Sequence, residues 1–316
     1  MGELAYLPDV DKPPIFVSAG IIKTEDQIER FAGVHHIAAQ IIGSFSEEEW
    51  GGNDPSGNKT VFWWEEKEQA AYNAVGLRNP GREAASEYLP RAIQKLHSVG
   101  QMALISVTSL AQEDPQEVLP RLAEWALDMG ADGVELDGSC PNHGALLCED
   151  IVATHEITAA VRERVGDQPY ISIKFASLPD YTIEQYKQDT RLPVDAITLI
   201  NAIRQQSPLN PQTGSKRIEV NDGYAGKSGP AIADKARNNL MSWSFNLSGD
   251  LPSLWGPGYQ LWSVGGVDNG QEIFNRVHDM GAYMVGAAQA FYRTKNPQAL
   301  AQQWAKEYNE ALMPAG

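Results

Sequence analysis

The sequence predicts a (β/α)8 barrel that takes in residues 1–316 as one domain. Eight short apolar runs alternate with amphipathic stretches along the whole chain, which indicates repeated strand–helix units. Several of these runs are rich in Val and Ile and apolar on both faces, as strands of a buried parallel sheet are. No Gly-rich or Ser-rich linker divides the chain, and eight strands in about 300 residues favour a closed barrel over an open sheet.

The predicted elements follow one another in a regular order. The strands are expected at residues 14–19, 36–42, 102–108, 132–137, 170–175, 195–200, 260–264 and 282–287. The helices are expected at residues 25–32, 84–98, 115–129, 147–165, 182–190, 230–242, 270–280 and 297–312. Two stretches interrupt the alternation, residues 43–82 and 202–229. Long insertions after barrel strands carry active-site loops, so we expect both stretches to lie at the catalytic face as loops.

The composition excludes several classes of function. A net charge of −16 favours solubility and speaks against nucleic acid or an anionic membrane as a partner. The two cysteines, Cys140 and Cys148, are too few for a disulfide scaffold or for an iron–sulfur cluster of the chain's own. No residues are spaced as metal ligands, and no run approaches the ~20 apolar residues of a membrane span. The first residues carry no secretory pattern, so we expect a reduced, cytoplasmic setting.

The stretch ELDGSCPN, residues 135–142, places Cys140 in a loop directly after the fourth predicted strand. Loops at that end of barrel strands carry the active site. A free cysteine is most often a small buried hydrophobic residue. In an accessible loop, however, a thiol with an ordinary pKa of about 8.5 becomes a usable base after a modest shift.

Two further features point to chemistry at the same end of the barrel. Gly265 and Gly266 end the seventh predicted strand, and Gly286 with Ala287 ends the eighth. Small residues there let backbone N–H groups close on a phosphate, although they could equally be turn residues without a ligand. Lys174 is a charge within an apolar strand, and a buried lysine needs a partner.

The motifs at these strand ends, taken in order, form a series that matches a known family. They are SAG (18–20), NAVGLRNPG (73–81), SCPN (139–142), SIKF (172–175), LINAI (199–203), DGYAGKSGPAI (222–232) and SVGGVDNGQEIFNRVHDMGAYMVGAA (263–288). In order and spacing the chain resembles the dihydroorotate dehydrogenase family, specifically its soluble class 1 enzymes. The resemblance runs from about residue 15 to about residue 300 and implies an FMN-binding barrel that serves pyrimidine biosynthesis.

The resemblance implies a role for each matching residue. The positions expected to bind FMN are Ser18, Ala19, Gly20, Ser44, Lys174, Asn201, Gly226, Gly265, Gly266, Gly286 and Ala287. Lys174 is expected at the pyrimidine edge of the flavin, where its charge stabilises the anionic reduced form. Cys140 is expected to remove a proton from the dihydropyrimidine while a hydride leaves for flavin N5. The residues expected to hold the flat substrate ring are Asn73, Asn142 and Asn201.

The chain departs from the family pattern at positions that contact substrate. Asp137 stands where the family has an asparagine, and Gly43, followed by Ser44, stands where it has a lysine. Losing a cation and gaining an anion makes the site two charge units less favourable for orotate. Arg204 is the best candidate for a relocated anion clamp, and Asp137 either pairs with it or faces a substrate donor such as an amine, amidine or guanidine.

Three functions therefore remain open. The chain is a dihydroorotate dehydrogenase, a flavin oxidoreductase with a different ring substrate, or a catalytically silent FMN-binding barrel. Without cluster cysteines, an NAD route requires a separate electron acceptor or reductase as a partner. The family also forms dimers, so a homodimer is expected from the resemblance.

Overall fold

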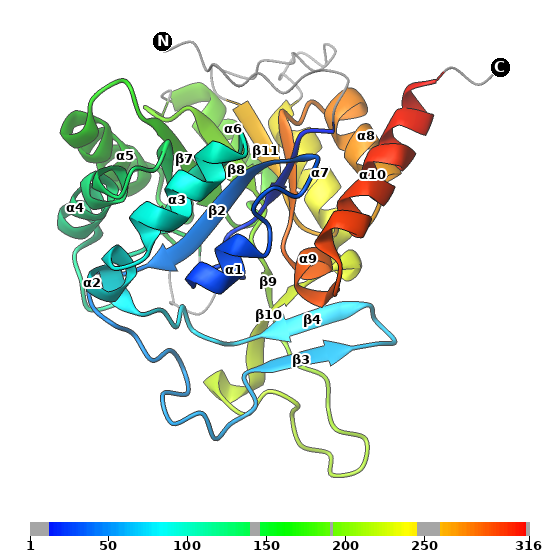
Figure 1. The fold of residues 1–316 in the computed structure, drawn as a ribbon. Helices are drawn as coiled ribbons and strands as arrows, with labels where there is room; N and C mark the ends of the chain where they lie inside the picture. Colours follow the sequence, from blue (N-terminus) through cyan, green and yellow to red (C-terminus); the bar gives the residue numbers. More distant parts are fainter. Residues whose placement is uncertain (1–12, 140–145, 190–191, 245–259, 314–316) are drawn as a thin grey trace.

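The computed structural model describes residues 13–139, 146–189, 192–244 and 260–313, and its main feature is a closed parallel barrel (Figure 1). Around the barrel the strand order is β1-β12-β11-β8-β7-β6-β5-β2, and β1 pairs with both β12 and β2. The barrel strands are β1 (Ile15–Val17), β2 (Ile37–Phe45), β5 (Met102–Val107), β6 (Gly133–Asp137), β7 (Tyr170–Phe175), β8 (Ala196–Leu199), β11 (Gln260–Ser263) and β12 (Met284–Ala287). All eight lie at the strands expected from the sequence, so the predicted fold is confirmed.

Helices cover the outside of the barrel, as Figure 1 shows. They are α1 (Glu25–Glu29), α2 (Gly81–Ser86), α3 (Leu89–Ser98), α4 (Pro115–Asp128), α5 (Ile151–Val165), α6 (Asp180–Asp189), α7 (Ala233–Ser244), α8 (Gly270–Phe274), α9 (Gln289–Arg293) and α10 (Pro297–Leu312). Short 3-10 turns precede α5 at Leu147–Glu149 and α7 at Pro230–Ile232, another lies at Asn221–Gly223, and a π turn at Asn275–Asp279 follows α8.

Local signals explain where several helices begin. Asp114 caps α4 by accepting a hydrogen bond from the backbone N–H of Gln116, and Pro115 follows at the first helical position. The helix expected at residues 84–98 is divided into α2 and α3. Pro90 lies in the first turn of α3, and a proline has no N–H with which to continue an existing helix.

The two stretches expected as loops also contain a second, antiparallel sheet. Its order is β3-β4-β10-β9, with β3 (Phe62–Glu65), β4 (Ala70–Asn73), β9 (Ile203–Gln206) and β10 (Tyr224–Ser228). Figure 1 shows this sheet below the barrel. This sheet within residues 43–82 and 202–229 was not anticipated from the sequence. The central pairing joins Asn73 to Gly226 across a long sequence separation, and such non-local pairing leaves no local pattern.

The barrel interior is layered. At its amino-terminal end an apolar cluster includes Phe16, Leu104, Tyr170 and Trp262, and the Trp262 ring lies 5.0 Å from Phe16 and 5.5 Å from Tyr170 between ring centres. Polar residues replace apolar ones toward the carboxyl ends of the strands. None of the helices in the described ranges is both long and apolar enough to cross a membrane.

Candidate active site

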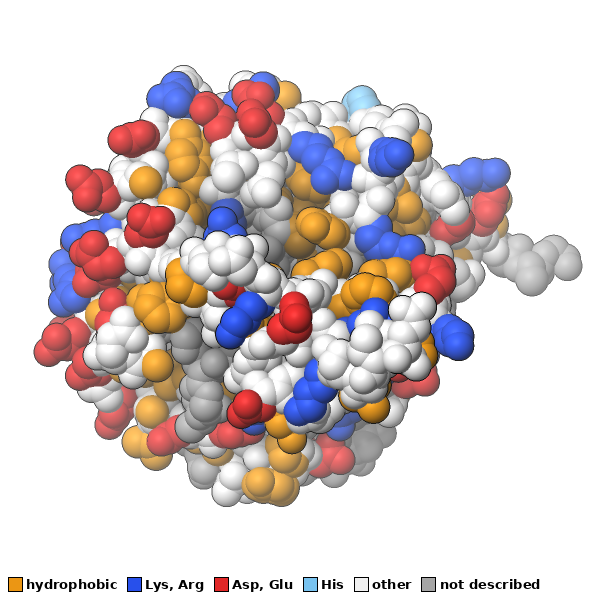
Figure 2. Space-filling model, turned by 90° about the horizontal axis from the view of Figure 1, so that it is seen from below, with side chains coloured by type: hydrophobic (Ala, Val, Ile, Leu, Met, Phe, Trp, Pro, Cys, Tyr) orange, Lys and Arg blue, Asp and Glu red, His pale blue; other side chains and the backbone are white. Residues whose placement is uncertain are grey.

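A cavity of about 360 Å³ lies between the carboxyl ends of the barrel strands and the small antiparallel sheet. Its walls come from the loops after β1, β8, β11 and β12, from β2, β6 and β7 at the floor, and from β3, β4 and β10 on the opposite side. Figure 2 views the molecule from the side of the small sheet, where hydrophobic side chains surround a hollow. The volume lies within the range of small-molecule and cofactor sites.

The structure brings most of the expected site residues into this cavity. Those that line it are Ser18, Ala19, Gly20, Ser44, Asn73, Asp137, Lys174, Asn201, Gly265, Gly266 and Ala287. Gly226 and Gly286 do not line it. Gly226 belongs to β10, where an added Cβ would lie 2.9 Å from the Ala202 side chain, and Gly286 faces the ring of Phe16. Cys140 and Asn142 lie outside the described residues.

Two opposite charges form the floor of the cavity. Asp137 on β6 and Lys174 on β7 are register partners, and they are 8% and 5% exposed. The Asp137 carboxylate accepts hydrogen bonds from Ser44 Oγ at 3.0 Å and from Ser139 Oγ at 3.4 Å. These bonds compensate a buried carboxylate, which would otherwise be costly, and they hold it at the cavity surface.

One layer deeper lies Glu135, a buried acid that the sequence analysis missed. Its side chain is 0% exposed, and its Oε2 accepts a hydrogen bond of 3.0 Å from Thr198 Oγ1. Among the described residues, Oε1 has no hydrogen-bond partner. Burial raises the pKa of the Glu135 carboxyl to about 7, although the neighbouring Lys174 charge opposes this rise. The signal was available, because Glu135 is a charge within an apolar strand, just as Lys174 is.

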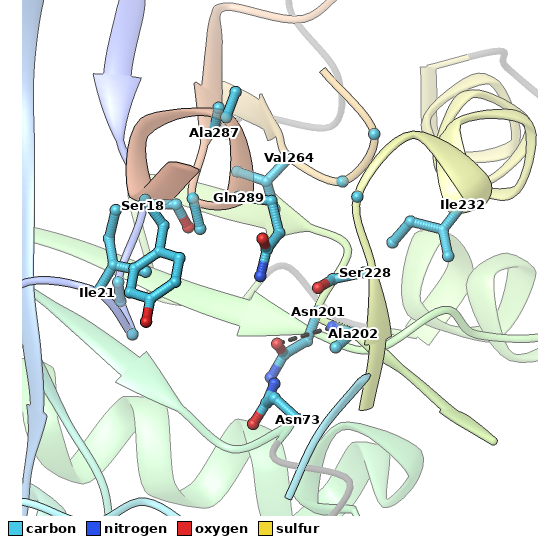
Figure 3. A pocket seen from close by; sticks show the side chains of 18 of the residues that line it. Ser18, Ile21, Asn73, Asn201, Ala202, Ser228, Ile232, Val264, Ala287 and Gln289 are labelled. Carbon is cyan, nitrogen blue, oxygen red and sulfur yellow. Dashed lines mark hydrogen bonds between the residues drawn. The ribbon is translucent and has the colours of Figure 1, made fainter. Parts of the chain in front are cut away.

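Two asparagine side chains face each other across one side of the cavity (Figure 3). Asn201 Nδ2 donates to Ser139 O and to Ser139 Oγ, both at 3.2 Å, and Asn201 Oδ1 accepts from the Ala202 backbone N–H at 2.8 Å. The Oδ1 atom of Asn73 lies 3.5 Å from the Val75 backbone nitrogen, a long hydrogen bond. The amide of Asn73 therefore keeps most of its capacity for a ligand.

The loop after β11 forms a backbone cradle at the other side of the cavity. Gly266 has a φ of +80°, and an added Cβ would lie 2.5 Å from Ala233 Cα, so only glycine fits there. Behind the loop, the fully buried Arg276 donates to Gly265 O at 2.7 Å and to Val264 O at 3.2 Å. Glu272 compensates the Arg276 charge at 2.8 Å. A loop of small residues whose carbonyl groups are fixed by a buried arginine suits a phosphate group, so the residues present fit FMN.

The rim of the cavity contains aromatic and cationic groups that were not expected there. The guanidinium of Arg293 lies 3.6 Å from the ring centre of Trp64, and the Phe62 and Tyr292 rings are 5.6 Å apart. All four residues line the cavity. Arg293 follows the last barrel strand, where a barrel phosphate site is common, so its position could have been found from the sequence.

The expected anion clamp at Arg204 is not in the cavity. Arg204 belongs to β9, is exposed, and stacks on the Tyr224 ring at 4.6 Å. It makes no ion pair with Asp137 in the part of the chain that the structure describes. The physical reason is that β9 belongs to the antiparallel sheet, which turns Arg204 outward. The position of Gly43 also cannot accommodate the lysine of the family pattern, because an added Cβ would lie 2.4 Å from Ser106 O.

Comparison with known proteins identifies relatives of this chain. A region of 211 residues is 29% identical to the catalytic subunit of dihydroorotate dehydrogenase B (NAD(+)) of Methanopyrus kandleri, covering 64% of this chain and 59% of that protein. A region of 164 residues is 31% identical to the protein of the same name from Methanothermobacter thermautotrophicus, covering 51% of this chain and 50% of that protein. The matched regions thus span between half and three fifths of each relative's length.

A solved structure and a family model extend the match. The crystal structure of DHODH from Eimeria tenella, in complex with ferulenol, superposes with a TM-score of 0.74 over 95% of this chain and 81% of that chain. Its sequence identity is 15%, so this likeness concerns the fold alone. The model of the dihydroorotate dehydrogenase family matches residues 10–310. The chain therefore belongs to the dihydroorotate dehydrogenase family.

Proposed function

We propose that the protein is an FMN-dependent oxidoreductase that removes a hydride and a proton from adjacent carbons of dihydroorotate or a related ring. The observation that carries the proposal is the convergence of Lys174, Asn73 and Asn201 on one cavity whose opposite side is the Gly265–Gly266 loop. Membership of the dihydroorotate dehydrogenase family supports the same class of reaction.

In this proposal the cavity residues divide between cofactor and substrate. The backbone of Gly265 and Gly266, with Ala287, holds the phosphate, and Ser18, Ala19 and Gly20 line the flavin. When bound, FMN supplies an electron acceptor that takes a hydride at its N5 atom. Lys174 provides a buried positive charge that favours negative charge in the cavity.

In the proposal, amide side chains bind the substrate, and the loop that contains Cys140 supplies the base. The amides of Asn73 and Asn201 each carry donors and an acceptor in their own plane, which suits the edge of a flat ring, and that of Asn73 makes only one long hydrogen bond among the described residues. Cys140, which lies outside the described residues, is proposed as the base that takes the substrate proton, and Asn142 as a third ring-binding amide. A well-placed base contributes about 10²–10⁴-fold to such a step.

Asp137 favours a second candidate substrate, a ring that carries an amine, amidine or guanidine. Its carboxylate lines the cavity and only accepts hydrogen bonds, whereas an asparagine would also donate. Beside it, Gly43 offers no cation, and Arg204 points elsewhere. These features weaken the site for a carboxylate and strengthen it for a donor group.

The proposal also includes the transfer of electrons from the reduced flavin to an acceptor. The two archaeal relatives are named as catalytic subunits of an NAD(+)-dependent enzyme. We propose that this chain likewise passes electrons to a separate protein, because the sequence contains only two cysteines and cannot ligate an iron–sulfur cluster alone.

The test begins with cofactor binding and continues to turnover. Purified protein is titrated with FMN and, in parallel, with riboflavin, which lacks the phosphate. FMN should bind more tightly, and the loaded protein should oxidise dihydroorotate with a dye as electron acceptor. Absence of FMN binding would contradict the proposal. Binding of FMN without turnover of dihydroorotate would favour the second candidate, to be assayed with dihydropyrimidines that carry an amino group.

A further inference from the structure

Glu135 lies inside the barrel, directly beneath the cavity floor. It shares a strand face with Asp137, two residues further along β6, because alternate residues of a strand point the same way. Its partner Thr198 is on β8, separated from β6 by β7, so the two side chains meet across the barrel interior. A buried carboxyl with one unpartnered oxygen is costly and calls for a functional reason.

Hydroxyl groups connect Glu135 with the cavity. Ser106 is the register partner of Glu135 on β5, and its hydroxyl lowers the pKa of the Glu135 carboxyl, against the effect of burial. Ser106 Oγ lies 2.8 Å from Ser44 Oγ, and Ser44 Oγ donates to Asp137 Oδ2 at 3.0 Å. Ser44 and Asp137 both line the cavity. Because a hydroxyl is both donor and acceptor, this series can pass a proton in either direction.

At the other end of the barrel, the described residues around the axis are mainly apolar. Below Glu135, the apolar cluster that includes Phe16, Leu104 and Trp262 fills the interior. These three side chains are at most 1% exposed and have no ionisable group, and the hydroxyl of Tyr170 in the same cluster donates to Gln260 Oε1 at 2.7 Å. The series of hydroxyl groups on the cavity side therefore favours proton exchange through the cavity.

The charges that face Glu135 come from neighbouring strands. Lys174 on β7 stabilises its ionised form, and Asp137 on β6 destabilises it. β5 and β8 present the hydroxyls of Ser106 and Thr198, and the register partner on β7 is Ser172, which is also neutral. Lys174 is thus the cation on which an ionised Glu135 depends. The same lysine lines the cavity and is available to a negative charge there.

We propose that Glu135 is a proton-binding site coupled to the cavity, which takes up one proton when a negative charge arrives beside Lys174. Such a charge competes with Glu135 for the lysine and repels its carboxylate, so protonation becomes favourable. The proton comes from solvent through the cavity, where the hydrogen-bonded groups of Asp137, Ser44 and Ser106 lead to the neighbouring strand position of Glu135. The inference rests on the proposed function, in which reduction of FMN creates that negative charge.

The first test compares midpoint potentials of the FMN-loaded protein over a range of pH around neutrality. For a two-electron couple each additional proton taken up steepens the slope by about 30 mV per pH unit. Wild type should show this additional slope, and Glu135→Gln should lack it. Ser172→Ala is the matched control, because Ser172 is a buried hydroxyl of the same layer that donates instead to Val134 O. Equal slopes in wild type and Glu135→Gln would overturn the proposal.

A second test needs no flavin and so separates this inference from the proposed function. Infrared spectra of the protein without cofactor, recorded against pH, should contain a protonated carboxyl that titrates near neutrality and is missing in Glu135→Gln. Identical titrations in both proteins would overturn the proposal even if FMN binds. If Glu135→Gln does not fold, Thr198→Val serves instead. It removes the Oε2 donor and should move the titration upward by roughly one pH unit, and an unmoved titration would count against Glu135.

Discussion

The two halves of the barrel interior differ sharply in composition. The amino-terminal half contains Phe16 and Trp262, whose rings contact each other among aliphatic side chains. The carboxyl-terminal half contains Glu135, Asp137 and Lys174, all of which are buried. Burial of apolar surface stabilises the fold by about 25 cal/mol per Å², whereas burial of charges is costly unless they are compensated. One half of the same barrel therefore stabilises the protein, and the other holds groups suited to chemistry.

The largest expected effect is on stability, in the apolar half. Trp262→Ala leaves a cavity among packed side chains and should lower the free energy of unfolding by about 3–5 kcal/mol. Denaturant unfolding measures this change. Trp64→Ala, at the rim of the cavity, is the matched control and should cost much less, because Trp64 is only partly buried. Similar losses for both variants would contradict the division between the two halves.

In the polar half, the largest effect should be on turnover. Lys174→Gln removes the buried cation and should reduce the turnover rate about 10²–10³-fold, as loss of a preorganised electrostatic group does. The variant should remain folded, because glutamine keeps much of the volume. Lys227→Gln is the control, since Lys227 pairs with Glu68 at 2.7 Å and does not line the cavity. Equal turnover in the Lys174 and Lys227 variants would exclude the proposed role of Lys174.

The free energy of unfolding should depend on pH because of Glu135 in the polar half. Burial raises the pKa of Glu135 from 4.5 to about 7, so the folded state binds this proton more tightly than the unfolded chain does. The contribution of Glu135 to stability is therefore greatest at acidic pH, falls as the pH rises through this interval, and is constant above it. The total change is on the order of 3 kcal/mol. Denaturant unfolding at several pH values should show this decline in wild type, and Glu135→Gln should lack it.

The smallest expected effect is a change of substrate preference at the cavity floor. Asp137→Asn replaces an acceptor by a group that both donates and accepts, and it removes a negative charge near the substrate. It should raise kcat/KM for dihydroorotate, relative to a ring with an amino donor, by about tenfold, or 1.4 kcal/mol. Parallel assays of both compounds measure the ratio. An unchanged ratio would mean that Asp137 does not contact the substrate.

Much of the barrel could be predicted from the sequence. Each barrel strand is a short apolar run bounded by helical patterns, as at Tyr170–Phe175. Such a pattern can be recognised in the sequence without knowledge of tertiary contacts. The small sheet could not be predicted. β9 contains exposed polar residues, and β10 pairs with β4 far away in the sequence, so neither periodicity nor spacing revealed them.

The sequence predicted which strand-end residues lie around the cavity, but it did not predict the direction of side chains outside the barrel strands. Gly265, Gly266 and Lys174 line the cavity because strand ends in a barrel converge. Arg204 was misjudged, because its direction depends on the antiparallel sheet to which β9 belongs. Glu135 was missed although a buried charge in an apolar strand was the reason for selecting Lys174.

The most direct test of the central claim is an anaerobic titration of the FMN-loaded protein with dihydroorotate, followed by the visible absorbance of the flavin. If the polar half of the barrel is an oxidoreductase site for dihydroorotate, the flavin absorbance should bleach as substrate is added. A flavin that stays yellow with dihydroorotate but bleaches with dithionite would contradict this substrate.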